Sequence, residues 1–225
     1  MKKIFFVLLA VVGFSMFVSA QTKTIFVIPS TAKIYVNGAE VGSGTYTYKF
    51  KRSEDFIMLK FENAGYITRE TRLLRENPNK SVSFSMSEDE AEKNSIGGGG
   101  EGSDSANKWF DINVKKGMSE DDAWKRLMSI TTKYFDDIEI RDKSAGWIKT
   151  AWKKTYFTDQ IVRTKMEVKT MFGDEGELKY QVRLSSQIAY KDCGQTDQCF
   201  VKYDRILRTF ETIIQELQRS VGSNN

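Results

Sequence analysis

Two long stretches of the chain alternate apolar and polar residues, at 162–172 and 178–190. Alternation of period two predicts strands with one face buried and the other in solvent. Gly173-Asp174-Glu175-Gly176 between them is typical of a turn. The pattern therefore predicts a long hairpin as the main feature of the C-terminal part of the chain.

Patterns of helical period flank this hairpin. Ser119, with Asp122 three residues later, predicts the start of a helix. Its apolar stripe is Ala123, Trp124, Leu127, Met128, Thr131 and Tyr134. A second stripe predicts a long helix over 203–221, with Gly222 placed as its cap. Shorter strands are expected at 138–141 and 147–157, and an additional one at 109–114.

This order of elements predicts an α+β domain over 107–225, an antiparallel sheet with two helices on one face. The region also resembles the TBP-like or helix-grip domains of secreted Bacteroidota proteins. The resemblance is carried by Asp142, by Gly146-Trp147-Ile148 and by the charged alternating hairpin that follows. It implies a curved sheet closed by a long helix, an architecture in which a small ligand can be carried.

The segment 21–87 is a series of short apolar stretches separated by turn signals. Strands are expected at 24–28, 34–36, 56–61 and 80–86, with turns at Asn37-Gly38, Gly42-Ser43-Gly44 and Ala64-Gly65. Asn-Gly is a type I′ turn signal. We expect a small, all-β antiparallel sandwich.

Residues 22–87 resemble a PEGA domain. The matching residues are Pro29 and Ala32, Val36-Asn37-Gly38, Val41-Gly42-Ser43-Gly44, Ile57-Met58-Leu59 and Ala64-Gly65-Tyr66. The tetrapeptide that gives the family its name is Pro29-Ser30-Thr31-Ala32 in this chain. The resemblance implies an envelope-associated interaction module without catalytic residues.

Ser30 and Lys33 also form an S-x-x-K pattern, which supplies nucleophile and base in penicillin-binding proteins. That chemistry needs a helix and two further motifs, S-D-N and K-T-G, and the sequence contains neither. Lys33 directly precedes the apolar run at 34–36, so we expect a loop and a strand here.

Residues 1–20 carry two lysines, an apolar run and Val18-Ser19-Ala20, which together predict a cleaved secretory signal peptide. We therefore expect secretion across the inner membrane, to the periplasm or the cell surface. In such an oxidising compartment, Cys193 and Cys199 are expected to form a disulfide. Residues 88–106 are acidic and end in a glycine-rich stretch, which predicts a flexible linker between two domains.

The sequence contains no histidine, which limits the catalytic and metal sites that the protein could form. Triads that use histidine and most zinc sites are excluded, and the carboxylates lie at turns or helix starts. We expect no enzyme, no catalytic residue, no metal and no cofactor. The net charge of +4 is small and divided by the acidic linker, so a nucleic-acid binder is not expected either.

Two groups of residues remain as candidates for binding. The solvent face of the hairpin presents Arg163, Lys165, Lys169, Lys179 and Arg183, with only Glu167 opposed. It is either a solvated face or a surface for an anionic partner. The expected strand 147–157 carries Trp147, Trp152 and Tyr156, which form either a glycan platform or part of the core.

We therefore expect a secreted, non-enzymatic envelope or surface protein that acts as a protein-interaction module. Its partner is expected to be another envelope protein or a cell-wall glycan. Two alternatives stay open, a glycan- or peptidoglycan-binding protein and a small-ligand carrier with a helix-grip-like domain.

Overall fold

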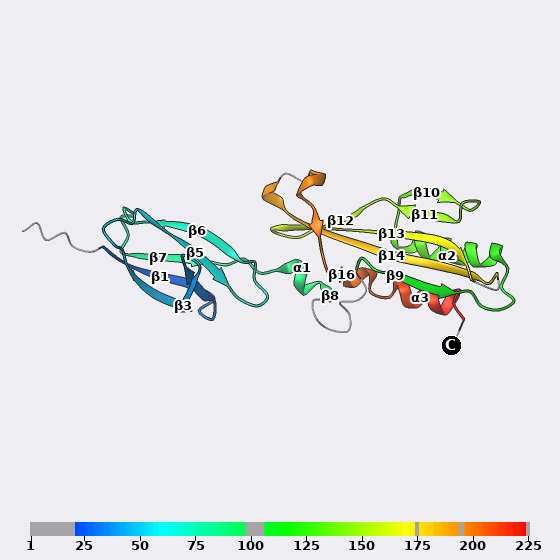
Figure 1. Cartoon of the computed structure of the whole chain (residues 1–225), viewed down its shortest axis with the longest axis horizontal. Helices are drawn as coiled ribbons and strands as arrows, with labels where there is room; N and C mark the ends of the chain where they lie inside the picture. The colour runs from blue at the N-terminus through cyan, green and yellow to red at the C-terminus, as the bar shows by residue number, and fades with distance from the viewer. Residues whose placement is uncertain (1–20, 98–105, 174–175, 194–195, 224–225) are drawn as a thin grey trace, which may run out of the picture. The chain divides into compact units, whose positions relative to one another are not determined.

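We describe the fold from a computed structural model covering residues 21–97, 106–173, 176–193 and 196–223. The expected signal peptide lies outside these residues. The chain divides after Met86 into two compact units, and its elements are labelled in Figure 1. The fold class is α+β, as expected. None of the described helices is long and apolar enough to cross a membrane.

The N-terminal unit is a sandwich of two sheets. One sheet has the order β4-β1-β7 and the other has the order β3-β2-β5-β6. Ile25, Val27, Ile34, Leu59 and Phe61 point between them and are almost fully buried. The strands are β1 (Thr22–Ile28), β2 (Lys33–Val36), β3 (Ala39–Ser43), β4 (Thr45–Lys49), β5 (Phe56–Glu62), β6 (Arg69–Leu74) and β7 (Ser81–Ser85).

One expectation about this sandwich is wrong, because its strands are not all antiparallel. β1 pairs with β4 antiparallel but with β7 parallel. The parallel pairing arises because the chain passes through the whole second sheet before β7 returns beside β1. A long connection of this kind permits parallel neighbours, whereas a tight hairpin does not.

The turn between β2 and β3 is the one that the Asn-Gly pair predicts. Asn37 and Gly38 both have positive φ, 49° and 87°, as a type I′ turn requires. The Asn37 side chain also accepts a hydrogen bond of 2.9 Å from the Met58 backbone N–H. In the S-x-x-K segment, Lys33 lies in β2 with its ammonium 3.2 Å from Glu40.

The C-terminal unit is built on the hairpin of β13 and β14, which stay paired from Gln160–Tyr190 to Phe172–Leu178. Figure 1 shows these two as the longest ribbons of the sheet. β11 and β12 pair with β13, while β9 and β15 pair with β14. The strands are β9 (Trp109–Asn113), β10 (Ile138–Asp142), β11 (Trp147–Thr150), β12 (Lys153–Tyr156), β13 (Gln160–Phe172), β14 (Leu178–Tyr190) and β15 (Val201–Lys202).

Two helices, α2 (Glu120–Tyr134) and α3 (Ile213–Ser220), cover one face of this sheet. The Ser119 hydroxyl caps α2 by accepting a hydrogen bond of 3.1 Å from the Asp122 N–H, which confirms the predicted start. Phe135 and Phe210 stack 5.2 Å apart in the same core. The sheet contributes its even-numbered residues, among them Val162, Met166, Val168, Tyr180, Val182 and Leu184.

The predicted helix 203–221 is wrong over its first half. Residues Arg205–Leu207 form β16, which pairs with β8 (Ser95–Gly97), and helix begins only at Ile213. The apolar stripe suits both structures, and a strand partner from a distant part of the chain decides between them. The expected strand 147–157 is also divided, into β11 and β12, with Ala151 and Trp152 between them.

The prediction of a flexible linker over 88–106 is wrong for residues 88–97. These residues form α1 (Glu90–Lys93) and β8, and they belong to the C-terminal unit. Ala91 and Ser95 are buried there. The rest of the expected linker, except Ala106, lies outside the described residues.

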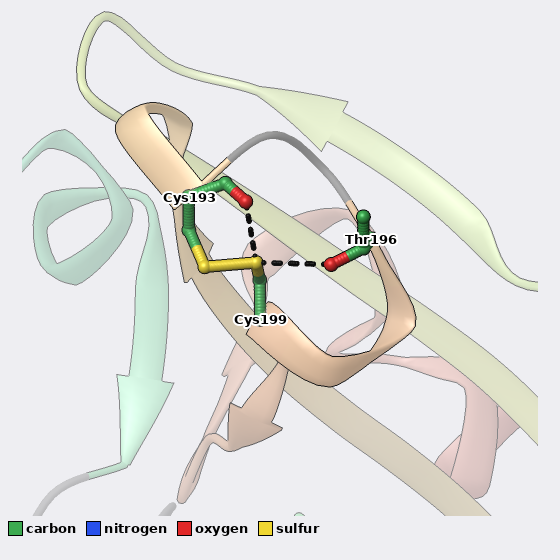
Figure 2. Close-up of a disulfide and its surroundings, with 3 residues drawn as sticks. All are labelled: Cys193, Thr196 and Cys199. Carbon is green, nitrogen blue, oxygen red and sulfur yellow. Dashed lines mark hydrogen bonds between the residues drawn. A yellow bond between two sulfur atoms is a disulfide. The ribbon is translucent and has the colours of Figure 1, made fainter.

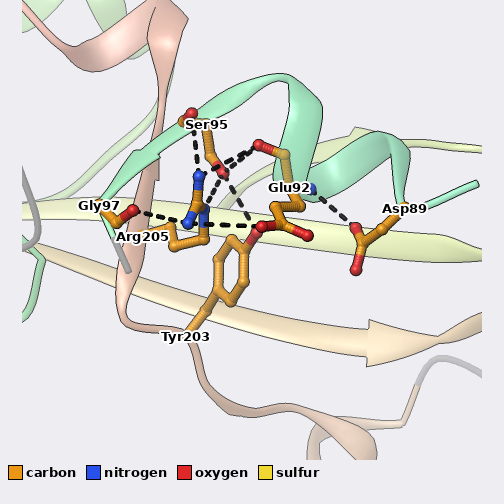
Figure 3. A network of polar contacts seen from close by, with 6 residues as sticks. All are labelled: Asp89, Glu92, Ser95, Gly97, Tyr203 and Arg205. Carbon is orange, nitrogen blue, oxygen red and sulfur yellow. Dashed lines mark hydrogen bonds and ion pairs between the residues drawn. The ribbon is translucent and has the colours of Figure 1, made fainter. Parts of the chain in front are cut away.

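Arg205 holds this segment in place (Figure 3). Its Nε donates to the Ser95 hydroxyl at 2.7 Å, and its Nη1 donates to the Gly97 carbonyl at 2.6 Å. The Ser95 hydroxyl in turn lies 3.2 Å from the Tyr203 hydroxyl. The largely buried guanidinium of Arg205 therefore provides hydrogen-bond donors for this segment. The acidic, glycine-rich composition predicted instead that the backbone here would be hydrated by solvent.

We expect Arg205→Ala to release this segment. Buried hydrogen bonds to a charged group contribute roughly 1.5–3 kcal/mol each, so hydrogen exchange at the amides of residues 92–97 should become faster. Exchange measured by mass spectrometry on the full chain tests this. Arg208→Ala is the control, because Arg208 is exposed and its ion pair among the described residues, with Glu211, is a long one of 4.0 Å. Equal exchange in both variants would contradict the role of Arg205.

Candidate functional site

The candidate site is the face of the large sheet that points away from α2 and α3, which we call the open face. It carries the odd-numbered side chains of β13 and β14, because their even-numbered neighbours pack under the helices. All the cations and aromatic residues singled out in the sequence occupy this face. The open face comprises Trp109, Asp111, Trp147, Trp152, Tyr156, Arg163, Lys165, Glu167, Lys169, Lys179, Gln181, Arg183, Ser185, Gln187, Phe200 and Lys202.

Arg163 is the most enclosed cation of the open face, with only 6% of its surface exposed. Its guanidinium lies 4.5 Å from the Trp152 ring centroid and 4.0 Å from that of Phe200. Its Nε donates to Gln187 Oε1 at 2.8 Å, and its Nη1 donates to Asp197 Oδ1 at 2.5 Å. The expectation of a solvent-exposed Arg163 is therefore wrong, because aromatic rings from outside the hairpin cover it.

A disulfide between Cys193 and Cys199 forms as predicted and closes the loop next to Arg163 (Figure 2). Asp197 lies inside the loop and Phe200 directly follows it. The hydrogen bond and charge of Arg163 lower the pKa of Asp197 below its usual range. The cross-link thus restrains the segment that places a carboxylate and a ring over Arg163.

Glu167 is the buried carboxylate at the centre of the open face, with 8% exposure. Arg183 Nε donates to it at 3.0 Å, and the Lys165 ammonium lies 3.5 Å away. Burial raises the pKa of Glu167, but the hydrogen bonds and charges of Arg183 and Lys165 outweigh burial and lower it. Two cations therefore share one ionised carboxylate.

Trp109 lies over a second pair of cations. The Arg183 guanidinium is 4.5 Å from its ring centroid and the Lys169 ammonium is 5.1 Å away. On the same strand, Asp111 forms an ion pair with Lys179 at 2.5 Å. The hydrogen bond from Lys179 lowers the pKa of Asp111. The face therefore carries Asp111 and Asp197 besides Glu167, and it is less basic than the hairpin sequence predicts.

The three residues expected as a glycan platform share the open face but differ in surroundings. Trp147 is 36% exposed and Tyr156 is 57% exposed. Trp152 is half-buried, with Arg163 and Lys165 within 4.7 Å of its ring centroid. A single continuous strand would put Trp147 and Trp152 on opposite faces; the break at 151–152 brings them to the same one.

A hollow of about 370 Å³ opens on this face. Trp152 and Lys165 lie on one side of it, and Arg183 and Ser185 come from β14. Its lining residues are Asn107, Trp152, Lys165, Arg183, Ser185, Gln187 and Lys202. Its volume lies in the range of small binding sites in proteins.

Sequence reasoning missed the residues that complete this surface from outside the hairpin, namely Trp109, Phe200 and Lys202. Aromatic side chains from outside the hairpin also stack on its cations, namely those of Trp109, Trp152 and Phe200. The signal for Trp109 was the additional strand expected at 109–114, which contains this residue.

Comparison with models of known protein families gives no match for this chain, and comparison with curated protein sequences finds none that is significantly similar. The function is therefore inferred from the residues and geometry of the open face.

We expect Glu167→Gln to destabilise the protein at neutral pH by about 1–3 kcal/mol, because two cations lose their charged partner. Because the pKa of Glu167 is lowered in the folded protein, this stabilisation is complete at pH values above the pKa of a glutamate in the unfolded chain, about 4.3. It is lost as the pH falls through the folded pKa. Between neutral pH and pH 3, the variant should therefore lose less stability than the wild type.

Urea unfolding at several pH values measures both effects. Glu177→Gln is the matched control, since Glu177 is exposed and forms none of the ion pairs found in the described residues. If Glu167→Gln and Glu177→Gln have the same stability and pH dependence, then Glu167 does not organise the open face.

Proposed function

We propose that this protein is a secreted, non-enzymatic envelope or surface protein that acts as a protein-interaction module. In this proposal its C-terminal unit contacts another envelope protein through the open face. The observation that carries the proposal is the stacking of Trp109 and Trp152 on Arg183 and Arg163. Tryptophan and arginine dominate the binding energy of protein interfaces.

The fixed geometry of these side chains supports the same proposal. Binding costs about 0.5–1.5 kcal/mol for each long side chain that must be immobilised. Arg163 and Arg183 are already held by carboxylates and aromatic rings in the free protein. A partner that docks on Arg183 and on the ring of Trp152 therefore has less ordering left to impose.

A glycan-binding role is the second candidate, and the exposed Trp147 and Tyr156 favour it. Sugars stack on free aromatic faces. The rings of Trp109 and Trp152 already have cations against them, which leaves less aromatic surface for a sugar. The open face therefore suits a protein partner better than a glycan.

The remaining alternative, a small-ligand carrier, would use the space between the sheet and the helices. The Thr164, Tyr180 and Ser186 hydroxyls are buried there without a hydrogen-bond partner among the described residues. However, stacked Phe135 and Phe210 and the other core side chains fill this layer. The packing therefore favours binding on the open face.

Photo-crosslinking in the native envelope tests the leading proposal. Benzoylphenylalanine in place of Tyr156 or Trp147 should yield the same crosslinked protein, identified by mass spectrometry. The same residue in place of Lys125, which is exposed on α2, is the control and should not yield it. The proposal fails if neither open-face position gives a crosslink, or if Lys125 gives the same product. Capture by purified peptidoglycan that Trp152→Ala abolishes would instead favour the glycan candidate.

A further inference from the structure

We propose that the hollow of the open face binds a carboxylate side chain from an acidic segment of a protein partner. This inference rests on the proposed function and names the chemistry of the partner. It begins with charge. Lys165 and Arg183 share a single carboxylate, that of Glu167. Lys202 is exposed and forms none of the ion pairs found in the described residues. The hollow therefore has two positive charges in excess.

Hydrogen-bonding capacity points the same way. Gln187 Oε1 accepts from Arg163 Nε at 2.8 Å, and a guanidinium only donates. This contact fixes the orientation of the amide, so the Gln187 NH₂ group is left to donate. Lys165, Arg183 and Lys202 are also donors only. Asn107 has both ends of its side chain engaged, with Tyr203 O at 2.7 Å and Ser186 N at 3.0 Å. The lining thus favours a ligand that accepts hydrogen bonds.

The surroundings of the hollow favour a side chain of a protein over a free anion or a glycan. Its volume of about 370 Å³ is sufficient for a carboxylate side chain. Trp152 forms part of its wall, while Trp147 and Tyr156 are exposed on the same face. A protein segment can fill the hollow with a carboxylate and cover these rings with its neighbouring residues. Charge complementarity at such a site selects the partner more than it raises affinity.

Fluorescence anisotropy with a labelled decaglutamate peptide and the full chain tests this inference. The critical variant is Lys202→Glu, because Lys202 is exposed and its replacement should leave the fold intact. The reversal removes one attraction and adds one repulsion, so affinity should fall about tenfold, which corresponds to about 1.4 kcal/mol. The control Lys125→Glu makes the same change of net charge on α2, away from the open face, and should bind like the wild type.

Two further measurements complete the test. A decaglutamine peptide should not bind, and the indole N–H signal of Trp152, assigned with Trp152→Phe, should shift only with decaglutamate. The inference is overturned if decaglutamate does not bind, or if Lys202→Glu and Lys125→Glu weaken it equally. It is also overturned if Lys202→Glu weakens the binding of peptidoglycan but not the binding of decaglutamate. Crosslinks from Tyr156 that persist in any of these cases would leave the proposed function standing.

Discussion

The C-terminal unit depends on the pairing of β13 with β14 along the whole length of both strands. Alternation of period two gives these strands one apolar and one polar face. The apolar face must be covered, and α2 and α3 cover it through Leu127, Ile213 and Leu217. Every other strand of the sheet pairs with one of these two strands or with their neighbours. The position of the open face therefore follows from the hairpin.

A polar face of this kind is usually left in solvent, yet here two of its charged members are largely enclosed. Arg163 and Glu167 are less than 9% exposed, and burial of a charge is costly unless it is paired. Each has such compensation, Arg163 from Asp197 and two rings, and Glu167 from Lys165 and Arg183. The result is a surface whose aromatic residues are held in place before any partner arrives.

Local features of this protein were predictable, because they depend on neighbouring residues. The Asn37-Gly38 turn, the cap at Ser119, the long hairpin and the short disulfide loop all belong to this group. The errors share a different cause. Arg205–Leu207 is a strand only because β8 pairs with it, and Arg163 is enclosed only because Phe200 and Trp152 fold over it. Period two identifies the face of a strand but not what covers that face.

The candidate site shows the same division between local and distant information. The cations Lys165 and Arg183 and the ring of Trp152 were visible in the sequence. Their meeting at one hollow with Lys202 depends on the pairing of β13 with β14 and on the pairing of β12 and β15 with this hairpin. Partners from elsewhere in the chain also changed the chemistry. Asp111 and Asp197 neutralise cations that the hairpin alone presents as free.

The central claim is that the open face is the surface covered by a partner in the envelope. Hydroxyl-radical footprinting of the full chain, purified and in isolated native envelopes, tests it most directly. The account predicts that Trp147 and Tyr156 are protected from oxidation in the envelope, whereas the exposed Met58 of the N-terminal unit serves as a reference outside this face. Equal oxidation of Trp147 and Tyr156 in both samples would contradict the claim.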